Sequence, residues 1–133
     1  MSTLKTNTIQ HLTSGFNNVV AHTDGAGTAN AVHCRGWVNF DGTGTVTIRA
    51  SFNVSSITDN NTGSYTVNFS NAMPDANYSV SFTPLRSLSD LGTQGCGSLR
   101  SGARSTTTCI LGTTDMNDTV FQDAVDVNVT VFR

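Results

Sequence analysis

The chain has 133 residues, a length expected for a single domain that can bury a core of its own. Charged residues make up 12% of it, about half the usual share, and the net charge of −2 provides no field that would collect nucleic acid. No apolar stretch approaches the ~20 residues needed to cross a bilayer, and the residues after Lys5 are polar, so we expect neither membrane insertion nor a secretory leader.

Composition also indicates the fold class. There is no glutamate and only one lysine, whereas threonine, asparagine, serine and valine are abundant. Glutamate and lysine favour helices, while threonine and valine favour strands. The sequence therefore predicts an all-β protein.

Residues 1–20 are polar, and their few apolar positions follow no sustained period. Because such a segment buries too little apolar surface to order itself, we interpret it as an extended arm that needs a partner surface. Leu4, Ile9 and Leu12 are the expected anchors, and a frayed terminus is the alternative. Residues 21–31 are small and are interpreted as a flexible linker, which gives an arm and linker over 1–31 and a β-domain over 32–133.

From residue 32 onward, apolar and polar residues alternate in short runs. The pattern predicts an antiparallel β-sandwich or small barrel of about six or seven strands. A slip of the alternation at Ile57 predicts a bulge or a strand end. Trp37 and Phe132 fall on faces opposite to the main apolar stripe. The predicted core is Val46, Ile48, Phe52, Val54, Tyr65, Val67, Phe69, Tyr78, Val80, Phe82, Val127 and Val129.

Loops are predicted from glycine and polar clusters. A turn is expected at 41–44, and residues 86–103, which hold four glycines, are predicted to form the longest irregular loop. A threonine-rich strand is expected over 104–111, followed by a polar loop over 112–122 and a last strand ending near Val131.

One long segment resembles a known family. Residues 37–79, WVNFDGTGTVTIRASFNVSSITDNNTGSYTVNFSNAMPDANYS, closely resemble a segment of virion structural proteins of tailed phages, including cyanophages, usually described as tail fibres. The opening STLKTNTIQ resembles the N-terminal peptide that often accompanies that segment. The resemblance implies a homotrimeric virion component that is assembled in the host cytoplasm and docks to other tail or baseplate proteins.

Two functions fit this resemblance. In the first, a short tail fibre docks by its arm and presents the β-domain to the host surface. In the second, a capsid decoration or cement protein lays the arm on capsid subunits. Both give an arm followed by a β-domain, so the sequence leaves them open.

Recognition is expected in loops, because a rigid sheet can present variable sequence there. The candidate receptor loop is 86–103 with Arg86, Arg100 and Arg104 near its edges, and a host-surface glycan is a candidate partner. The exposed threonine and asparagine faces are interpreted mainly as solvated sheet surface, with a sugar-binding face that includes Trp37 as the alternative.

The sequence contains no motif that indicates catalysis. No paired catalytic carboxylates, serine–histidine–aspartate order or metal-ligand cluster stands out, so we expect no enzyme activity, cofactor or metal. The three cysteines are Cys34, Cys96 and Cys109. Free thiols are expected in a reducing cytoplasm, and a bridge between Cys96 and Cys109 after particle release is the alternative.

Overall fold

The computed structural model describes residues 20–24, 27–31, 34–86, 95–115 and 120–133. The described residues contain ten strands and no helix, and so no helix of the length and hydropathy that crossing a membrane requires. The chain divides into two units, Met1–His33 and Cys34–Arg133. The expected arm anchors Leu4, Ile9 and Leu12 lie outside the described residues.

The described part of the first unit is a β-hairpin of β1 (Val20–Asp24) and β2 (Gly27–Ala31), paired from Val20↔Ala31 to Asp24↔Gly27. The interpretation of 21–31 as a flexible linker was therefore wrong in its local structure. The register leaves two residues between the strands, Gly25 and Ala26, and glycine at the first position of a two-residue connection is a hairpin signal that outweighs the small-residue composition.

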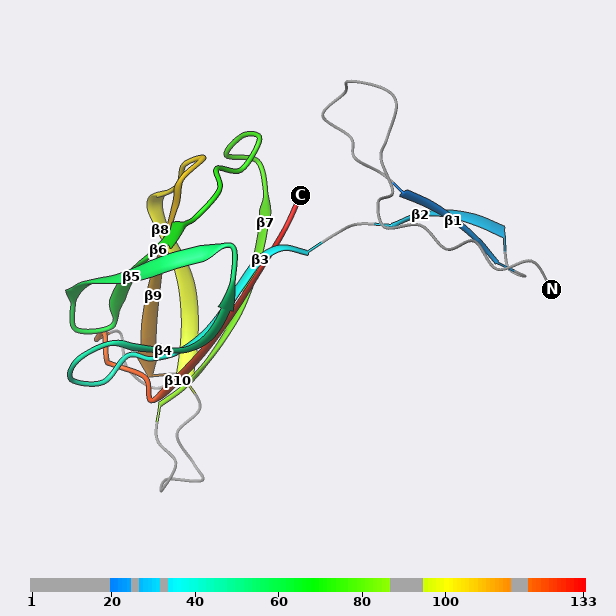
Figure 1. Cartoon of the computed structure of the whole chain (residues 1–133). Helices are drawn as coiled ribbons and strands as arrows, with labels where there is room; N and C mark the ends of the chain where they lie inside the picture. Colours follow the sequence, from blue (N-terminus) through cyan, green and yellow to red (C-terminus); the bar gives the residue numbers. More distant parts are fainter. Residues whose placement is uncertain (1–19, 25–26, 32–33, 87–94, 116–119) are drawn as a thin grey trace. The chain divides into compact units, whose positions relative to one another are not determined.

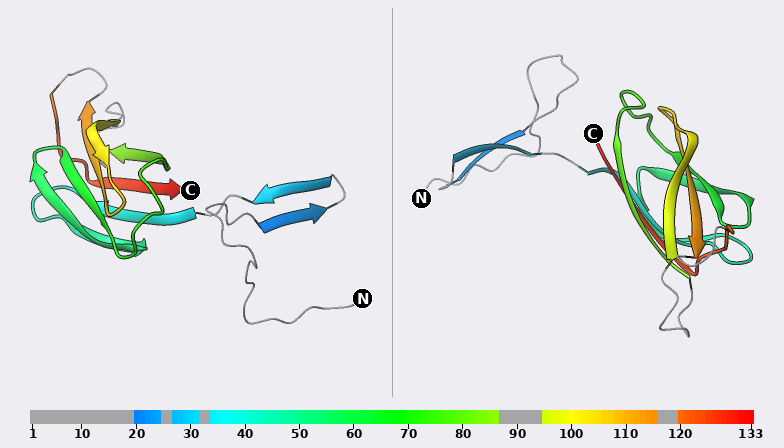
Figure 2. Two further views of the ribbon diagram at one scale, coloured as in Figure 1. Left: turned by 90° about the horizontal axis from the view of Figure 1, so that it is seen from above. Right: turned by 180° about the vertical axis from the view of Figure 1, so that it is seen from behind.

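The second unit is a sandwich of two four-stranded antiparallel sheets, with strand orders β4-β3-β10-β7 and β5-β6-β9-β8 (Figures 1 and 2). The structure confirms the predicted all-β fold as a sandwich and not a small barrel, with eight described strands in its two sheets where about six or seven were expected. Its strands are β3 (Cys34–Asp41), β4 (Thr47–Phe52), β5 (Val54–Asn61), β6 (Ser64–Phe69), β7 (Ser79–Leu85), β8 (Gly95–Arg104), β9 (Thr108–Asp115) and β10 (Asp126–Phe132).

The core lies between the two sheets. Every predicted core residue except Phe52 is buried or packs against the buried cluster. Phe40 and Tyr65 meet edge to face near its centre, with ring centroids 5.2 Å apart. The cluster also contains Val38, Phe40, Met73, Cys109, Leu111, Ala124 and Val131.

The assignment of Phe52 to the core was wrong, because its side chain is 56% exposed. The pairing of β3 with β4 shifts by one residue between Asn39 and Phe40, which leaves Arg49 with no opposite residue on β3. Such a bulge reverses the alternation of the residues that follow it. Phe52 therefore lies opposite Trp37 on the outer face of the sheet.

Asn53 forms the corner at which the chain leaves one sheet for the other. Its φ is +55°, a conformation that asparagine tolerates better than most residues. Its side-chain amide donates to the carbonyl of Arg35 at 2.9 Å, and its side-chain oxygen accepts from the amide of Asn71 at 2.8 Å. A further register shift between Val54 and Ser56 confirms the bulge that the slip of alternation predicted.

The prediction of an irregular loop over 86–103 was also wrong in part, because Gly95–Arg104 forms β8. A Cβ atom at Gly97 would overlap the ring of Phe82. Glycine is therefore required here by close packing between β7 and β8, and not by a turn.

Candidate functional site

The outer face of the β4-β3-β10-β7 sheet carries a cluster of exposed aromatic side chains. Trp37, Phe52 and Phe132 are 39%, 56% and 36% exposed. Trp37 pairs across the strands with Phe52 on one side and with Thr130 on the other, and Phe132 follows Thr130 by two residues on β10. Since residues two apart in a strand share a face, the three rings form one patch, which we call the aromatic face.

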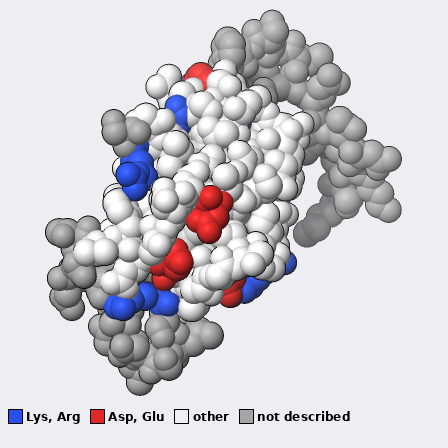
Figure 3. Space-filling view, turned by 90° about the vertical axis from the view of Figure 1, so that its left-hand side faces the viewer, with Lys and Arg blue, Asp and Glu red and all other residues white. Residues whose placement is uncertain are grey.

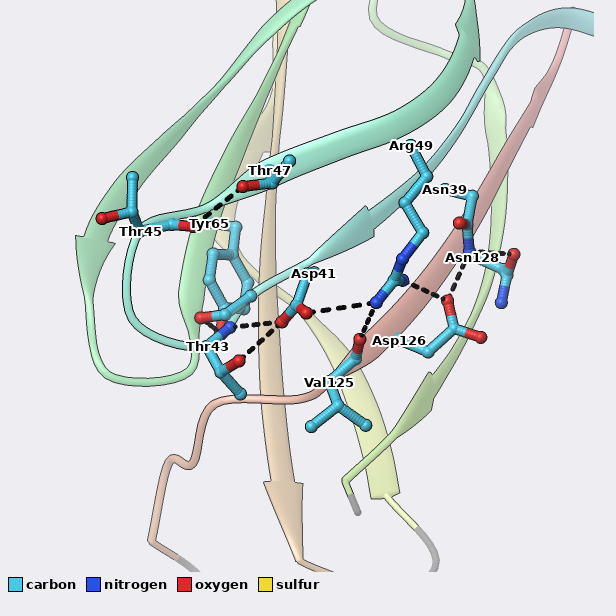
Figure 4. Close-up of polar contacts among 11 residues, drawn as sticks. Asn39, Asp41, Thr43, Thr45, Thr47, Arg49, Tyr65, Val125, Asp126 and Asn128 are labelled. Carbon is cyan, nitrogen blue, oxygen red and sulfur yellow. Dashed lines mark hydrogen bonds and ion pairs between the residues drawn. The ribbon is translucent and has the colours of Figure 1, made fainter. Parts of the chain in front are cut away.

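A polar network occupies the other half of the same outer face (Figure 4). The Arg49 guanidinium lies 3.1 Å from a carboxylate oxygen of Asp41 and 3.0 Å from one of Asp126, and donates to the carbonyl of Val125 at 2.6 Å. The bulge directs Arg49 to this position. The network therefore ties the bulged β4 to β3 and to the start of β10.

Asparagine side chains continue the network across the sheet. The Asn39 side-chain amide donates to the side-chain oxygen of Asn128 at 2.8 Å and also to Asp126 (Figure 4). Exposed ion pairs are worth about 0–1 kcal/mol each, so these contacts add little to the stability of the fold.

The hydrogen bonds of Asp41 stabilise its charged carboxylate, which suits a structural role better than proton transfer. Its carboxylate accepts from the Thr43 hydroxyl at 2.6 Å and from the Thr43 amide at 2.9 Å, and these bonds, with the charge of Arg49, lower its pKa below the usual value. A carboxylate whose charged form is held in this way is a poor proton acceptor. Among the described residues, no group of three or more histidine, cysteine or acidic side chains is placed to hold a metal ion.

Short polar side chains bond to one another on β5 and β6. The Asn68 amide donates to the hydroxyls of Ser56 and Thr58 at 3.1 and 3.0 Å, and the Asn60 amide donates to the Thr66 hydroxyl at 2.9 Å. On the face of the molecule shown in Figure 3, uncharged residues also outnumber charged ones. The polar but uncharged contacts on β5 and β6 agree with the interpretation of these strands as solvated sheet surface.

The three arginines of the expected receptor loop lie on regular structure or beside it. Arg86 directly follows β7 and is half-buried, whereas Arg100 and Arg104 lie on β8 and are exposed. Arg100, Arg104 and their neighbours line a surface hollow of about 320 Å³, and Arg86 is not among the residues that line it. The structure thus places two of the three arginines on one strand, but their guanidinium groups lie over different rings, that of Arg100 over Phe121 and that of Arg104 over Tyr78.

Cys34, Cys96 and Cys109 are all free thiols, and the bridge considered for Cys96 and Cys109 is not formed. Cys96 pairs with Thr114 on β9, five residues along that strand from Cys109. At about 3.4 Å per residue the separation is roughly 17 Å, far beyond the ~7 Å that a disulfide spans. Burial raises the pKa of the Cys109 thiol to about 11.

In comparisons with known proteins, the chain matches no family model, no curated protein and no solved structure. The candidate surfaces are therefore the aromatic face and the hollow beside β8, both assigned from geometry alone.

Proposed function

We propose that this chain is a structural protein of a bacteriophage virion, a short tail fibre that docks through its N-terminal segment and presents the β-sandwich to the host surface. The proposal is supported by the resemblance of residues 37–79 to phage virion proteins. This segment supplies β4, β5 and β6 completely, and so contributes strands to both sheets.

The observation that carries the proposal is the aromatic face. A patch of exposed aromatic side chains on a sheet marks a contact surface, because water-exposed aromatic groups favour association. Trp37 and Phe52 belong to the segment that resembles virion proteins. In the proposed fibre, three copies of the chain bury this face against one another in a homotrimer, and tail or baseplate proteins hold the trimer on the particle.

The mass of the purified chain in solution tests the assembly. We expect a trimer by light scattering at micromolar concentration, and a folded monomer for the double variant Trp37→Ser, Phe52→Ser. Leu99→Ser is a matched control, because Leu99 is 37% exposed but lies on β8 in the other sheet. A wild-type chain that is folded and monomeric would contradict the proposed trimer.

The position on the particle is tested by labelling purified virions with a gold-conjugated antibody against residues 34–133. Label at the tail is the expected result. Label spread over the head would replace the tail-fibre proposal with the capsid decoration alternative, and unlabelled particles would refute both. Competition by the soluble chain for phage adsorption to host cells then tests host contact.

A further inference from the structure

Residues 70–78 link β6 of one sheet to β7 of the other, and we call them the crossing segment. Met73 fixes this segment to the sandwich, because its side chain is buried and its amide donates to the carbonyl of Thr106 at 2.7 Å. Figure 1 shows the segment before β7 at the same end of the sandwich as the end of β10. The crossing segment therefore offers a fixed support at this end of the sheet that carries the aromatic face.

Asp75 of the crossing segment holds the residue that follows Phe132. The Arg133 guanidinium donates to both carboxylate oxygens of Asp75, from Nε at 3.1 Å and from Nη2 at 2.6 Å. A pair with two parallel bonds fixes direction as well as distance. The carboxylate is itself oriented by the turn, because it also accepts from the backbone amide of Asn77 at 2.7 Å.

The end of β10 is irregularly paired at the point where Asp75 and Arg133 meet. The register between β10 and β3 shifts between Val131 and Phe132, which leaves Arg35 with no opposite residue on β10. On its other side Phe132 pairs with Ser79, the first residue of β7. Strand ends open more readily than strand centres, so a tie directly after Phe132 restricts the backbone that carries its ring.

The crossing segment also supports the chain beside Phe52. Asn53 directly follows Phe52, and its side-chain oxygen accepts from the backbone amide and the side-chain amide of Asn71 at 2.8 and 3.1 Å. The side-chain amide of Asn53 donates to the carbonyl of Arg35, the residue that the register shift leaves unopposed, at 2.9 Å. The crossing segment thus holds the chain next to two of the three rings of the aromatic face.

We propose that Asp75 is a positioning residue for the aromatic face, and that through Arg133 it holds Phe132 in the orientation in which the face meets another copy of the chain. The contact with another copy rests on the proposed function, whereas the ordering of the strand end does not. The two steps are therefore tested by separate measurements.

Hydrogen exchange of the dilute full chain, followed by mass spectrometry, tests the ordering. The variant is Asp75→Asn, because an asparagine oxygen can still accept from the amide of Asn77 while the charged pair with Arg133 is lost. We expect the amides of 131–133 to exchange about three- to tenfold faster in this variant, the effect of losing one well-aligned surface ion pair. Asp59→Asn is the matched control, since Asp59 is exposed, lies on β5 in the other sheet and changes the net charge equally.

Sedimentation equilibrium tests the effect on assembly. Asp75→Asn and Arg133→Gln should each weaken association about three- to tenfold, and the double variant no further than either alone, because both remove the same pair. Asp59→Asn should leave association unchanged. In a Phe132→Ser background, Asp75→Asn should have no further effect on association, whereas a general loss of stability would act there as well.

Unchanged exchange at 131–133 in Asp75→Asn would overturn the proposal, whatever the mass of the chain. An equal effect of Asp75→Asn on association with and without the Phe132 ring would also overturn it, because Asp75 would then act on the fold as a whole. Faster exchange in a chain that is monomeric as wild type would refute the proposed trimer and support the positioning of Phe132 alone. Thermal unfolding of each variant confirms that the comparison is made between folded proteins.

Discussion

Phe40 and Phe52 lie on adjacent strands but on opposite faces of their sheet, and the replacement of each by alanine should separate the two environments. Phe40 is fully buried and packs edge to face on Tyr65. We expect Phe40→Ala to lower the free energy of unfolding by about 3–5 kcal/mol, since it removes a packed ring and leaves a cavity. The lost aromatic pair contributes about 0.5–1.5 kcal/mol of this.

Phe52→Ala should cost much less. Phe52 is 56% exposed, so less than half of its surface leaves water on folding. Full burial of a phenylalanine side chain is worth roughly 1.5–3 kcal/mol, which scales to about 1 kcal/mol here, and no enclosed cavity remains.

Urea unfolding of both variants, followed by far-ultraviolet circular dichroism, measures the difference. Fluorescence is less suitable, because Trp37 is the only tryptophan and pairs directly with Phe52. The protein is kept dilute enough to remain monomeric, since association through the aromatic face would add to the apparent cost of Phe52→Ala. Equal costs in the monomer would show that β4 has no bulge at Arg49.

Three further predictions concern the backbone and the titrating groups. Asn53→Ala should lower the free energy of unfolding by about 1–3 kcal/mol, measured by thermal melting, and Asn53→Gly should cost less because glycine accepts the positive φ. Gly97→Val should cost about 1–3 kcal/mol in the same assay, because its side chain would overlap the ring of Phe82; a neutral result would argue against the close packing of β7 on β8. Stability should change with pH at both ends of the range, as followed by urea midpoints. The raised pKa of Cys109 means that its contribution is complete below pH 9.0 and is lost as the pH rises toward about 11, a dependence that Cys109→Ala should weaken. The lowered pKa of Asp41 means that its contribution is present above pH 3.8 and is lost as the pH falls further; the same acid loss in Asp41→Asn would contradict this assignment.

The alternation of apolar and polar residues predicted the central strands well. β6 and β10 each have a neighbouring strand on both sides, and their inward residues, such as Tyr65, Val67 and Val129, are buried as predicted. In these strands no bulge turns the following residues to the other face of the sheet, so every second residue packs in the core. Burial therefore alternates with the same two-residue period as the apolar and polar residues of the sequence.

The alternation gave a wrong prediction for β4, because the apolar and polar residues alternate regularly through the position of the bulge. The run from Val46 to Val54 is regular in the sequence, but Arg49 is drawn to Asp41 and Asp126, and Asp126 is distant in the chain. A shift that occurs together with contacts to residues distant in the chain cannot be predicted from the local pattern. The aromatic face depends on this shift, so the outward positions of Trp37 and Phe132 could be predicted from the alternation, but that of Phe52 could not.

β8 was missed for a different reason. Its glycines indicated a loop, because glycine in a sequence does not distinguish a turn from close packing. Gly97 is needed where β8 meets Phe82 of β7, a contact between two sheets. Arg100 and Arg104 were singled out from the sequence, but their shared hollow depends on the irregular pairing of β8 between Leu99 and Arg104.

The aromatic face and the hollow differ in chemistry and belong to different sheets. The aromatic face gains free energy when water is excluded, which favours contact with another protein surface. The hollow is lined by small, apolar and basic residues, and its chemistry is more polar than that of the aromatic face. Because Trp37 lies on β3 and Arg100 on β8, an assembly that covers the aromatic face leaves β8 on the other sheet. The two surfaces can therefore be probed separately, and Trp37→Ser should weaken association, measured by light scattering, while the sheet that contains β8 keeps its fold.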